Sequence, residues 1–359
     1  MESSLSRIFA LLLDREYQRE IFQDLPGFQR KGTGYIACCP FHEDTLPTMV
    51  IYNDRPEYFC FACSRRGDWI HYLMERKGLS FYDVMTRLAM ASELEVQGYD
   101  ETQWRQDLLK SQILEGLMGF FITGLWSPQG EEALHYLYDR GYATGEVKGM
   151  GLGYYPGYEE TLGVLHAADR TSQDGTPFSG SQGFNRTAGA GLVVPFRDSS
   201  GRLMGLVHRD ITGKGPGSYT PLTSMEGLDD VPFLLYRSRR QKDVIVVEGF
   251  FDALLLDQIR MMPVMGVGSG GMTSKKLNTA EACGCRHFIL ALGNGERRRA
   301  SARAAVGLIQ EHGLAASILP IPGKYADIDE FIRMTCLDHY KALLKKTIPA
   351  GKWLAEHPS

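Results

Sequence analysis

The sequence predicts an α+β protein of several domains, with a small antiparallel ribbon, a mixed α/β core and a parallel sheet flanked by helices on both faces. The chain has 359 residues, of which 43% are hydrophobic and 23% charged, as expected for folded domains. Two closely spaced pairs of cysteine and histidine residues lie near the N-terminus. From residue 244 onward, short apolar runs alternate with segments of helical length, which is typical of a parallel sheet.

The length allows two or three domains, each with its own core. Apolar side chains have helical spacing at residues 80–122, and the polar stretch at residues 97–106 is interpreted as a linker. The expected domains are residues 1–95, 96–240 and 241–335, followed by a C-terminal helical tail at 336–359.

The ribbon is predicted at residues 48–52 and 57–61, which alternate or carry β-forming side chains. Cys39 and His42 form a Cys-x2-His pair, and Cys60 and Cys63 form a Cys-x2-Cys pair. A two-residue gap lets both ligands of a pair reach one ion from a tight turn, and four such donors suit tetrahedral Zn²⁺. We therefore predict a structural zinc ion. Cys38 is an alternative to Cys39, but only Cys39 keeps the two-residue gap.

Aromatic and basic residues surround this pattern. Exposed rings stack on unpaired bases while cations hold phosphates, so Arg65 and Arg66 are candidate contacts to single-stranded nucleic acid. The same rings also suit the core of a very small domain. Both interpretations stay open because the sequence does not give side-chain direction. The rings are those of Phe41, Tyr52, Tyr58, Phe59, Phe61 and Trp69.

The overall charge does not identify a partner. The chain has 39 Lys and Arg against 43 Asp and Glu, a net charge of −4, so any nucleic-acid surface must be a local patch. The seven cysteines are too unevenly placed for a disulfide scaffold. No apolar run approaches the roughly 20 residues that span a bilayer. We expect a cytoplasmic protein with no membrane partner.

The second domain is expected to contain a two-stranded unit at residues 192–196 and 203–207. It leads past Arg209 into a glycine-rich run at residues 213–217 that includes Lys214. Such a loop lets the backbone approach phosphates closely, although it is also common as a flexible connection.

In the third domain, strands are predicted at residues 244–247, 264–267, 287–292 and 316–321, and helices at 250–259, 274–282 and 300–312. Functional groups of such sheets lie at the carboxyl ends of the strands. Glu248 and Asp252 follow the first of these strands, and Asp327 and Asp329 follow the last. Clustered carboxylates are the hard oxygen ligands that Mg²⁺ requires.

Several of these motifs resemble bacterial and phage DNA primases. The run from Cys39-Pro40-Phe41-His42 to Gly67-Asp68-Trp69-Ile70 is similar to their N-terminal zinc ribbon, and residues 133–156 resemble the opening of their polymerase core. The Glu-Gly-x-x-Asp motif at Glu248 and the acidic motif at Asp327 and Asp329 resemble a Toprim domain, the Rossmann-like catalytic fold of primases and topoisomerases. The resemblance spans about residues 25–335.

The resemblance implies synthesis of RNA primers from ribonucleoside triphosphates on a single-stranded DNA template. It implies Mg²⁺ or Mn²⁺ as cofactor, held by Glu248, Asp252, Asp327 and Asp329, with Glu248 as the catalytic residue. Asn185, Arg186 and Arg209 are the nearest matches to family residues that bind template or nucleotide, whereas the Lys-Tyr pair that follows in the family reads Ser218-Tyr219. Few residues follow the acidic motif, so a replicative helicase is expected to act in trans.

The sequence departs from the family after the strand at 287–292. The Asp-x-Asp of Toprim domains is replaced by Gly293-Asn294-Gly295, followed by Glu296 and three arginines. Three explanations stay open: a naturally impaired site, a site rebuilt around Glu296 as a magnesium ligand, or an altered copy of an active enzyme. Aspartates placed at 293 and 295 should restore metal ligands if the site is merely impaired. The arginines either grip phosphates in place of the metal or form a solvated helix start.

The alternative function is a catalytically silent module that binds single-stranded DNA in plasmid, phage or mobile-element replication. A topoisomerase or Toprim nuclease fits less well, because topoisomerases need a large strand-gating domain and the N-terminal ribbon is foreign to them.

Overall fold

The computed structural model divides into two compact units, Met1–Leu108 with Ser200–Arg202 and Leu109–Ser199 with Leu203–Ser359. The boundary lies within helix α5 (Glu101–Leu125). The predicted linker is therefore wrong from residue 101 onward, because Glu, Gln, Arg and Leu there are good helix formers despite their polarity. The structure describes residues 11–12, 14–32, 34–53, 56–91, 101–170, 184–199, 201–211, 219–224, 230–238 and 241–356.

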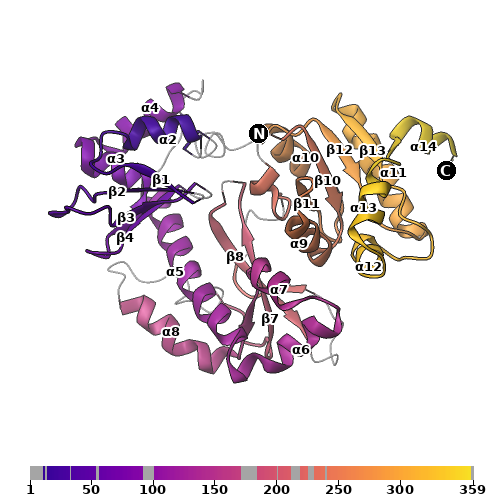
Figure 1. Ribbon diagram of the computed structural model, residues 1–359, viewed down its shortest axis with the longest axis horizontal. Helices are drawn as coiled ribbons and strands as arrows, with labels where there is room; N and C mark the ends of the chain where they lie inside the picture. Colours follow the sequence, from indigo (N-terminus) through magenta and orange to yellow (C-terminus); the bar gives the residue numbers. More distant parts are fainter. Residues whose placement is uncertain are drawn as a thin grey trace. The chain divides into compact units, whose positions relative to one another are not determined.

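The first unit contains an antiparallel sheet of five short strands in the order β1-β2-β3-β4-β5. Helices α2, α3 and α4 lie on one side of this sheet, with α4 against α3 (Figure 1), and the shared core includes Phe22, Met49, Tyr58, Trp69 and Tyr72. This arrangement confirms the predicted antiparallel ribbon. The elements are α2 (Arg15–Phe22), β1 (Gln29–Lys31), β2 (Gly34–Ala37), β3 (Met49–Ile51), β4 (Glu57–Cys60), β5 (Arg66–Asp68), α3 (Trp69–Lys77) and α4 (Phe81–Ala91).

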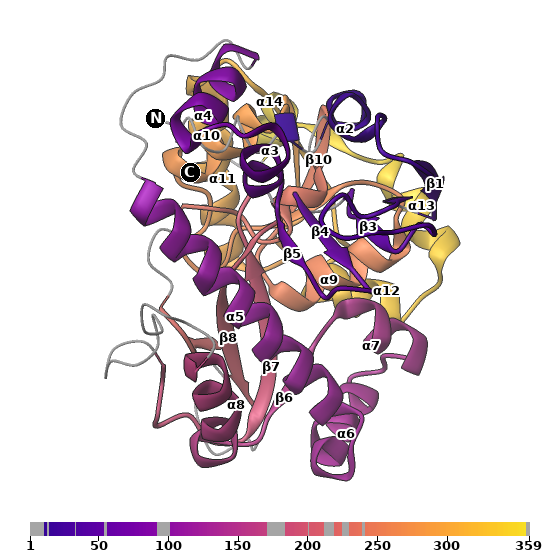
Figure 2. The same ribbon diagram turned by 90° about the vertical axis from the view of Figure 1, so that its left-hand side faces the viewer.

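The second unit begins with a four-stranded antiparallel sheet in the order β6-β7-β8-β9. Helix α5 runs along this sheet (Figure 2), and its Leu117 and Phe121 share a core with Tyr155 and Val193. The predicted two-stranded unit corresponds to β7 and β8. The elements are α6 (Glu131–Asp139), α7 (Thr144–Met150), β6 (Gly153–Tyr155), α8 (Tyr158–Arg170), β7 (Gly191–Arg197), β8 (Leu203–Asp210) and β9 (Tyr219–Pro221), with 3-10 turns at Pro128–Gly130 and Leu235–Ser238.

A five-stranded sheet completes the second unit, in the order β11-β10-β12-β13-β14. The pairs β10–β11, β10–β12 and β12–β13 are parallel. Along β10, Ile245 and Val247 join one core, whereas Val244 and Val246 join the core on the opposite face. The elements are β10 (Asp243–Val247), α9 (Phe250–Ile259), β11 (Val264–Gly266), α10 (Ser274–Ala282), β12 (His287–Leu290), α11 (Glu296–Glu311), β13 (Ala315–Ile318) and α12 (Ile328–Arg333).

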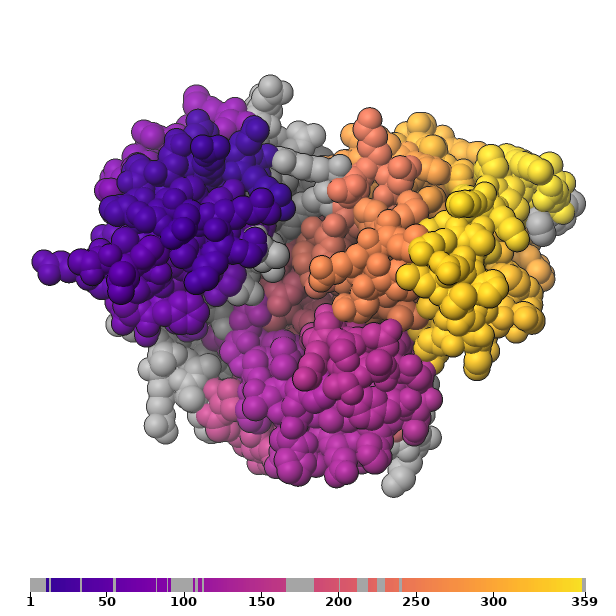
Figure 3. Space-filling view, in the orientation of Figure 1, coloured from indigo at the N-terminus to yellow at the C-terminus, as the bar shows by residue number. Residues whose placement is uncertain are grey.

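Helices cover both faces of this sheet, as predicted. Residues of α9 and α12 belong to the core on one face, and residues of α10 and α11 belong to the core on the other. This part of the chain, coloured orange to yellow, forms one continuous body in the space-filling view (Figure 3). Among the described residues, no helix has the length and apolar composition needed to cross a membrane.

The C-terminal tail contains a strand as well as the predicted helices. Strand β14 (Ile348–Pro349) pairs antiparallel with β13, between helices α13 (Leu337–Leu344) and α14 (Ala350–Glu356). The buried Trp353 joins the core of the five-stranded sheet. Two residues are too few to produce a recognisable strand periodicity, so β14 could not be predicted from the sequence.

Candidate metal centre and acidic cavity

Four ligand side chains meet at one end of the ribbon sheet. One possible ligand atom from each of Cys39, His42, Cys60 and Cys63 lies within 4.8 Å of all the others. The Sγ atoms of Cys39 and Cys63 are 4.0 Å apart. Tetrahedral zinc with Zn–S distances of about 2.3 Å places two sulfurs about 3.8 Å apart. The cluster therefore has the dimensions of a zinc site, and it contains Cys39 rather than the neighbouring Cys38.

The surroundings of His42 support metal binding. Its buried Nδ1 has no hydrogen-bond partner among the residues that the structure describes, and its Nε2 lies 3.9 Å from Oδ2 of Asp44. A buried nitrogen without a partner is costly, whereas a ligating histidine backed by a carboxylate is common. Asp44 accepts hydrogen bonds from the Cys39 backbone N–H at 2.8 Å and from Thr48 Oγ1 at 2.6 Å, and these bonds hold its pKa below the usual value. The residues present fit a structural Zn²⁺.

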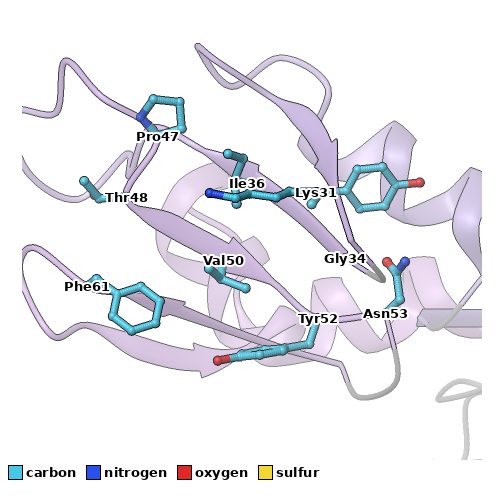
Figure 4. Close-up of a pocket in the computed structure, with 10 residues that line it drawn as sticks. Lys31, Gly34, Ile36, Pro47, Thr48, Val50, Tyr52, Asn53 and Phe61 are labelled. Atoms are coloured by element: carbon cyan, nitrogen blue, oxygen red, sulfur yellow. The ribbon is translucent and has the colours of Figure 1, made fainter.

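The aromatic residues around the centre serve two purposes. Tyr58 and Trp69 are buried in the core of the first unit, as the core interpretation expected. Phe61 is 68% exposed. It lines a hollow of about 470 Å³ on the ribbon sheet together with Tyr52 and Lys31 (Figure 4). This hollow offers aromatic surface and a cation, which are the components of a base-stacking platform.

The two candidate arginines of the ribbon differ in their contacts. Arg65 lies 4.7 Å over the ring of Phe41 and 3.6 Å from Oε2 of Glu75, so it packs against the helical side of the unit. Arg66 is exposed on β5. Their role in DNA binding stays a prediction.

A second site lies at the carboxyl ends of the parallel strands. The strand order reverses between β10 and β12, and ligands of such sheets bind at this switch point. A cavity of about 320 Å³ opens there and contains all four of the predicted acidic residues. Its lining consists of Glu248, Asp252, Asp327, Asp329, Arg140, Arg209, Arg298, Tyr219, Gly249, Phe250 and Phe251.

Asp329 is buried among fixed partners. Its Oδ1 accepts a hydrogen bond from the Tyr142 hydroxyl at 2.8 Å, and its Oδ2 pairs with Arg333 and lies 3.4 Å from Nη2 of Arg140. Its backbone N–H donates to Asp252 Oδ1 at 3.1 Å. Burial, followed by the nearby Asp327 and Asp329, raises the pKa of Asp252 to about 7. Both aspartates therefore help to connect α9 and α12.

The other two carboxylates are paired with the arginines that begin α11. Glu248 pairs with Arg297 and lies 3.7 Å from Nε of Arg298. Asp327 lies 3.6 Å from Nη2 of Arg298, and it caps α12 by accepting the Glu330 N–H at 3.0 Å. The interpretation of the arginine run as a solvated helix start is therefore wrong for Arg298, whose side chain is only 26% exposed.

The acidic residues do not fit a magnesium ion in this arrangement. Among the described residues, the zinc cluster is the only group of three or more acidic, histidine or cysteine ligands close enough to share an ion. Glu248, Asp327 and Asp329 are paired with arginines, and magnesium needs oxygen ligands at about 2.0–2.1 Å around one point.

The comparisons with known proteins agree with the zinc site. Residues 8–104 match the model of the CHC2 zinc finger family. A DNA primase of Chlamydia trachomatis is 28% identical over 331 residues, which cover 89% of this chain and 55% of the relative. The chain is similar to DNA primases. A primase of Staphylococcus aureus (strain COL) is 23% identical over 342 residues, which cover 88% of this chain and 56% of that protein. The chain thus spans about half the length of the curated primases that it matches.

Solved primase structures have the same fold. The zinc-binding and RNA polymerase domains of the Aquifex aeolicus primase match with a TM-score of 0.62 and 21% identity, covering 98% of this chain and 88% of that one. A primase catalytic domain bound to single-stranded DNA matches with a TM-score of 0.56 and 18% identity, covering 68% and 80% of the two chains. The resemblance to primases predicted from the motifs is confirmed, and so is the mixed α/β fold.

In this primase-like fold, the loop that replaces Asp-x-Asp, Gly293-Asn294-Gly295, is held by hydrogen bonds and close packing. The Asn294 side chain donates to the carbonyls of Ile321, Pro322 and Tyr325 at 3.1, 3.2 and 2.7 Å. Gly293 has φ +90°, and a Cβ atom there would lie 2.6 Å from the carbonyl oxygen of Ala326. An aspartate at 293 cannot enter without rearrangement, so the expected repair of the metal site by simple replacement is not compatible with this loop.

The predicted nucleotide-binding residues are only partly brought together. Arg209 reaches the cavity, where it donates to the Tyr136 hydroxyl at 3.2 Å and lies 4.8 Å over the Tyr219 ring. Asn185 and Arg186 do not line the cavity: Asn185 donates to the carbonyl of Pro221, and Arg186 lies over Tyr158. Lys214 lies outside the described residues.

Glu296 is likewise outside the cavity. Its side chain is 79% exposed, and its carboxylate oxygens lie 3.4 Å from Arg299 and from Arg303 on the same helix. This placement gives no support to a site rebuilt around Glu296.

No sequence motif indicated a role for Arg140 in the cavity. Its guanidinium lies 4.5 Å over the Phe251 ring and faces Asp329, which is 189 positions later in the chain. An arginine at the end of a helix gives no local signal of such a contact. Only the packing of α6 near the acidic residues reveals it.

Proposed function

We propose that this chain is a primase-type nucleotidyltransferase that synthesises RNA primers on a single-stranded DNA template. The observation that carries the proposal is the cavity at the switch point of the parallel sheet, where Glu248 lies with three arginines, in a chain similar to DNA primases along most of its length.

The ribbon would contact the template. Its hollow, lined by Phe61, Tyr52 and Lys31, offers rings for unpaired bases and a cation for the backbone. The further candidate contacts are Arg65 and Arg66 on the same ribbon, and Asn185, Arg186 and Lys214 in the expected second domain. A primase catalytic domain of similar fold has been solved with single-stranded DNA, which supports template contacts by the candidates outside the ribbon.

The cavity would receive the incoming ribonucleoside triphosphate. Guanidinium groups such as those of Arg140 and Arg209 suit phosphate oxygens because they offer several donors in a planar fork. In the reaction, the primer 3′-hydroxyl oxygen bonds to the α-phosphorus and pyrophosphate leaves. Glu248 would accept the hydroxyl proton.

Mg²⁺ or Mn²⁺ is the cofactor that the resemblance implies, with Glu248, Asp252, Asp327 and Asp329 as the candidate ligands of this Toprim-like site. It would supply positive charge to the phosphates. Because the acidic residues do not fit such an ion as they are arranged, we assign no step to it. A cytoplasmic location and a helicase supplied by another protein complete the proposal.

A primer-synthesis assay tests the proposal. Wild-type protein is incubated with single-stranded template and labelled ribonucleoside triphosphates, with Mg²⁺ and with Mn²⁺ in parallel. We expect short labelled RNA from the wild type and at least a tenfold lower yield from Glu248→Gln, because the amide cannot accept the proton. Glu296→Gln is the matched control, since its carboxylate lies outside the cavity, and it should keep full yield.

Equal yield from Glu248→Gln and wild type would place the chemistry elsewhere. Absence of product from the wild type with either metal would overturn primer synthesis. Binding of single-stranded DNA by the same preparation would then favour a second function, a catalytically silent DNA-binding module. The specific observation in favour of that function is the Gly293-Asn294-Gly295 loop, which offers no carboxylate to the cavity.

A further inference from the structure

Arg298 lies where the acidic residues of the cavity converge. Its Nε is 3.7 Å from Oε2 of Glu248, and its Nη2 is 3.6 Å from Oδ2 of Asp327. Its Nη1 donates to the carbonyl oxygen of Ala326. All three guanidinium nitrogens thus face acceptors, and one cation bridges the acidic residues that follow β10 and β13.

Gly293 leaves the room that this guanidinium occupies. A Cβ atom at position 293 would lie 2.6 Å from Nη1 of Arg298 as well as 2.6 Å from the carbonyl oxygen of Ala326. A carboxylate side chain at 293 and the observed position of Arg298 therefore exclude each other.

Arg297 also pairs with Glu248, but its side chain is 72% exposed and, among the described residues, it does not reach Asp327. We propose that Arg298 is the resident cation shared by both carboxylates and that it competes with divalent metal ions for Glu248 and Asp327. A divalent ion must approach carboxylate oxygens to about 2.0–2.1 Å, and it is repelled by a positive charge held beside the same oxygens. The side chain of Arg298 is only 26% exposed, so solvent screens this repulsion less than at an open surface. The inference goes beyond primer synthesis and does not depend on it.

The test measures Mn²⁺ binding to the zinc-loaded full chain, without nucleotide or DNA, from the electron paramagnetic resonance signal of free Mn²⁺. Arg298→Gln removes the charge but keeps most of the length, whereas Arg298→Lys keeps the charge. We expect Arg298→Gln to bind one Mn²⁺ at least tenfold more tightly than wild type, and Arg298→Lys to bind as weakly as wild type. Arg299→Gln is the control, because Arg299 pairs with Glu296 one turn away, and it should not change the affinity.

Equal Mn²⁺ affinity in wild type and Arg298→Gln would overturn the proposal. If Arg298→Gln does not fold, the comparison of wild type with Asp327→Asn decides the matter. Tight Mn²⁺ binding by the wild type that is lost in Asp327→Asn would show that Arg298 does not occupy the site. Lack of primer synthesis overturns the proposed function but leaves this measurement intact. The two failures are therefore distinguishable.

Discussion

At the scale of single residues, the acidic cavity is shaped by side chains that neutralise each other. Glu248 and Asp327 face Arg298, and Asp329 faces Arg140 and Arg333. Breaking one partner of a part-buried pair leaves the other charge uncompensated. Substitutions in the cavity should therefore affect stability as well as activity, and each needs a folding measurement beside it.

Gly293 and Gly295 provide a matched comparison. Both have positive φ, +90° and +103°, so an aspartate at either position should cost about 1–2 kcal/mol in backbone strain. A Cβ atom at 293 would meet neighbouring atoms, whereas one at 295 would meet none within 4 Å in the described part of the chain. We expect Gly293→Asp to lower the free energy of unfolding clearly more than Gly295→Asp, as measured by urea denaturation. Equal losses of unfolding free energy in the two variants would show that the Ala326 carbonyl and Arg298 do not crowd a side chain at 293.

At the scale of elements, the start of α9 depends on Asp252. Its Oδ2 accepts the Gly249 N–H at 3.2 Å, which caps the helix, and its Oδ1 accepts the Asp329 N–H at the start of α12. The side chain of Asp252 is buried, and burial raises its pKa. The carboxyl group that joins α9 to α12 therefore resists ionisation.

This burial predicts a pH dependence. The pKa of Asp252 is raised from 3.8 in the unfolded chain to about 7 in the folded one, so its contribution to stability is fully present below pH 4 and is lost as the pH rises through about 7. The loss amounts to at most about 4 kcal/mol. We expect Asp252→Asn to flatten the dependence of the unfolding free energy on pH between 4 and 7. An unchanged slope in this variant would show that Asp252 ionises in the folded protein as it does in water.

At the scale of the whole molecule, the chain has two compact units with separate hydrophobic cores. Among the described residues, the core of the first unit consists of residues from Leu12 to Leu88, and the cores of the parallel sheet consist of residues of the second unit. Structural zinc contributes folding free energy directly to the domain that holds it. Loss of zinc should therefore affect one unit and spare the other.

Hydrogen exchange resolved by peptide tests this expectation. We expect Cys39→Ser to release the zinc and to remove protection from β2 to β5, while β10, β12 and β13 stay protected. Cys38→Ser is the matched control, since Cys38 is buried beside Cys39 but is not one of the four clustered ligands. Retention of zinc by Cys39→Ser, or its loss from Cys38→Ser, would contradict the assigned ligand set.

The sequence by itself determined the features that depend on short spacings. Two-residue gaps located the four zinc ligands, and local periodicity located α9 and α10 with their observed bounds. The positions of the carboxylates after predicted strands located the edge of the sheet at which the cavity opens.

Only the tertiary structure decided which side chains share an environment. It placed Tyr58 and Trp69 in a core but Phe61 on the surface, joined Arg140 to Asp329, added β14 to the sheet, and set Arg298 against Glu248. The physical reason is that periodicity and spacing reflect contacts between neighbours in the chain. Contacts between residues far apart in sequence depend instead on how whole elements pack, and in this protein those contacts determine which cation the acidic residues face.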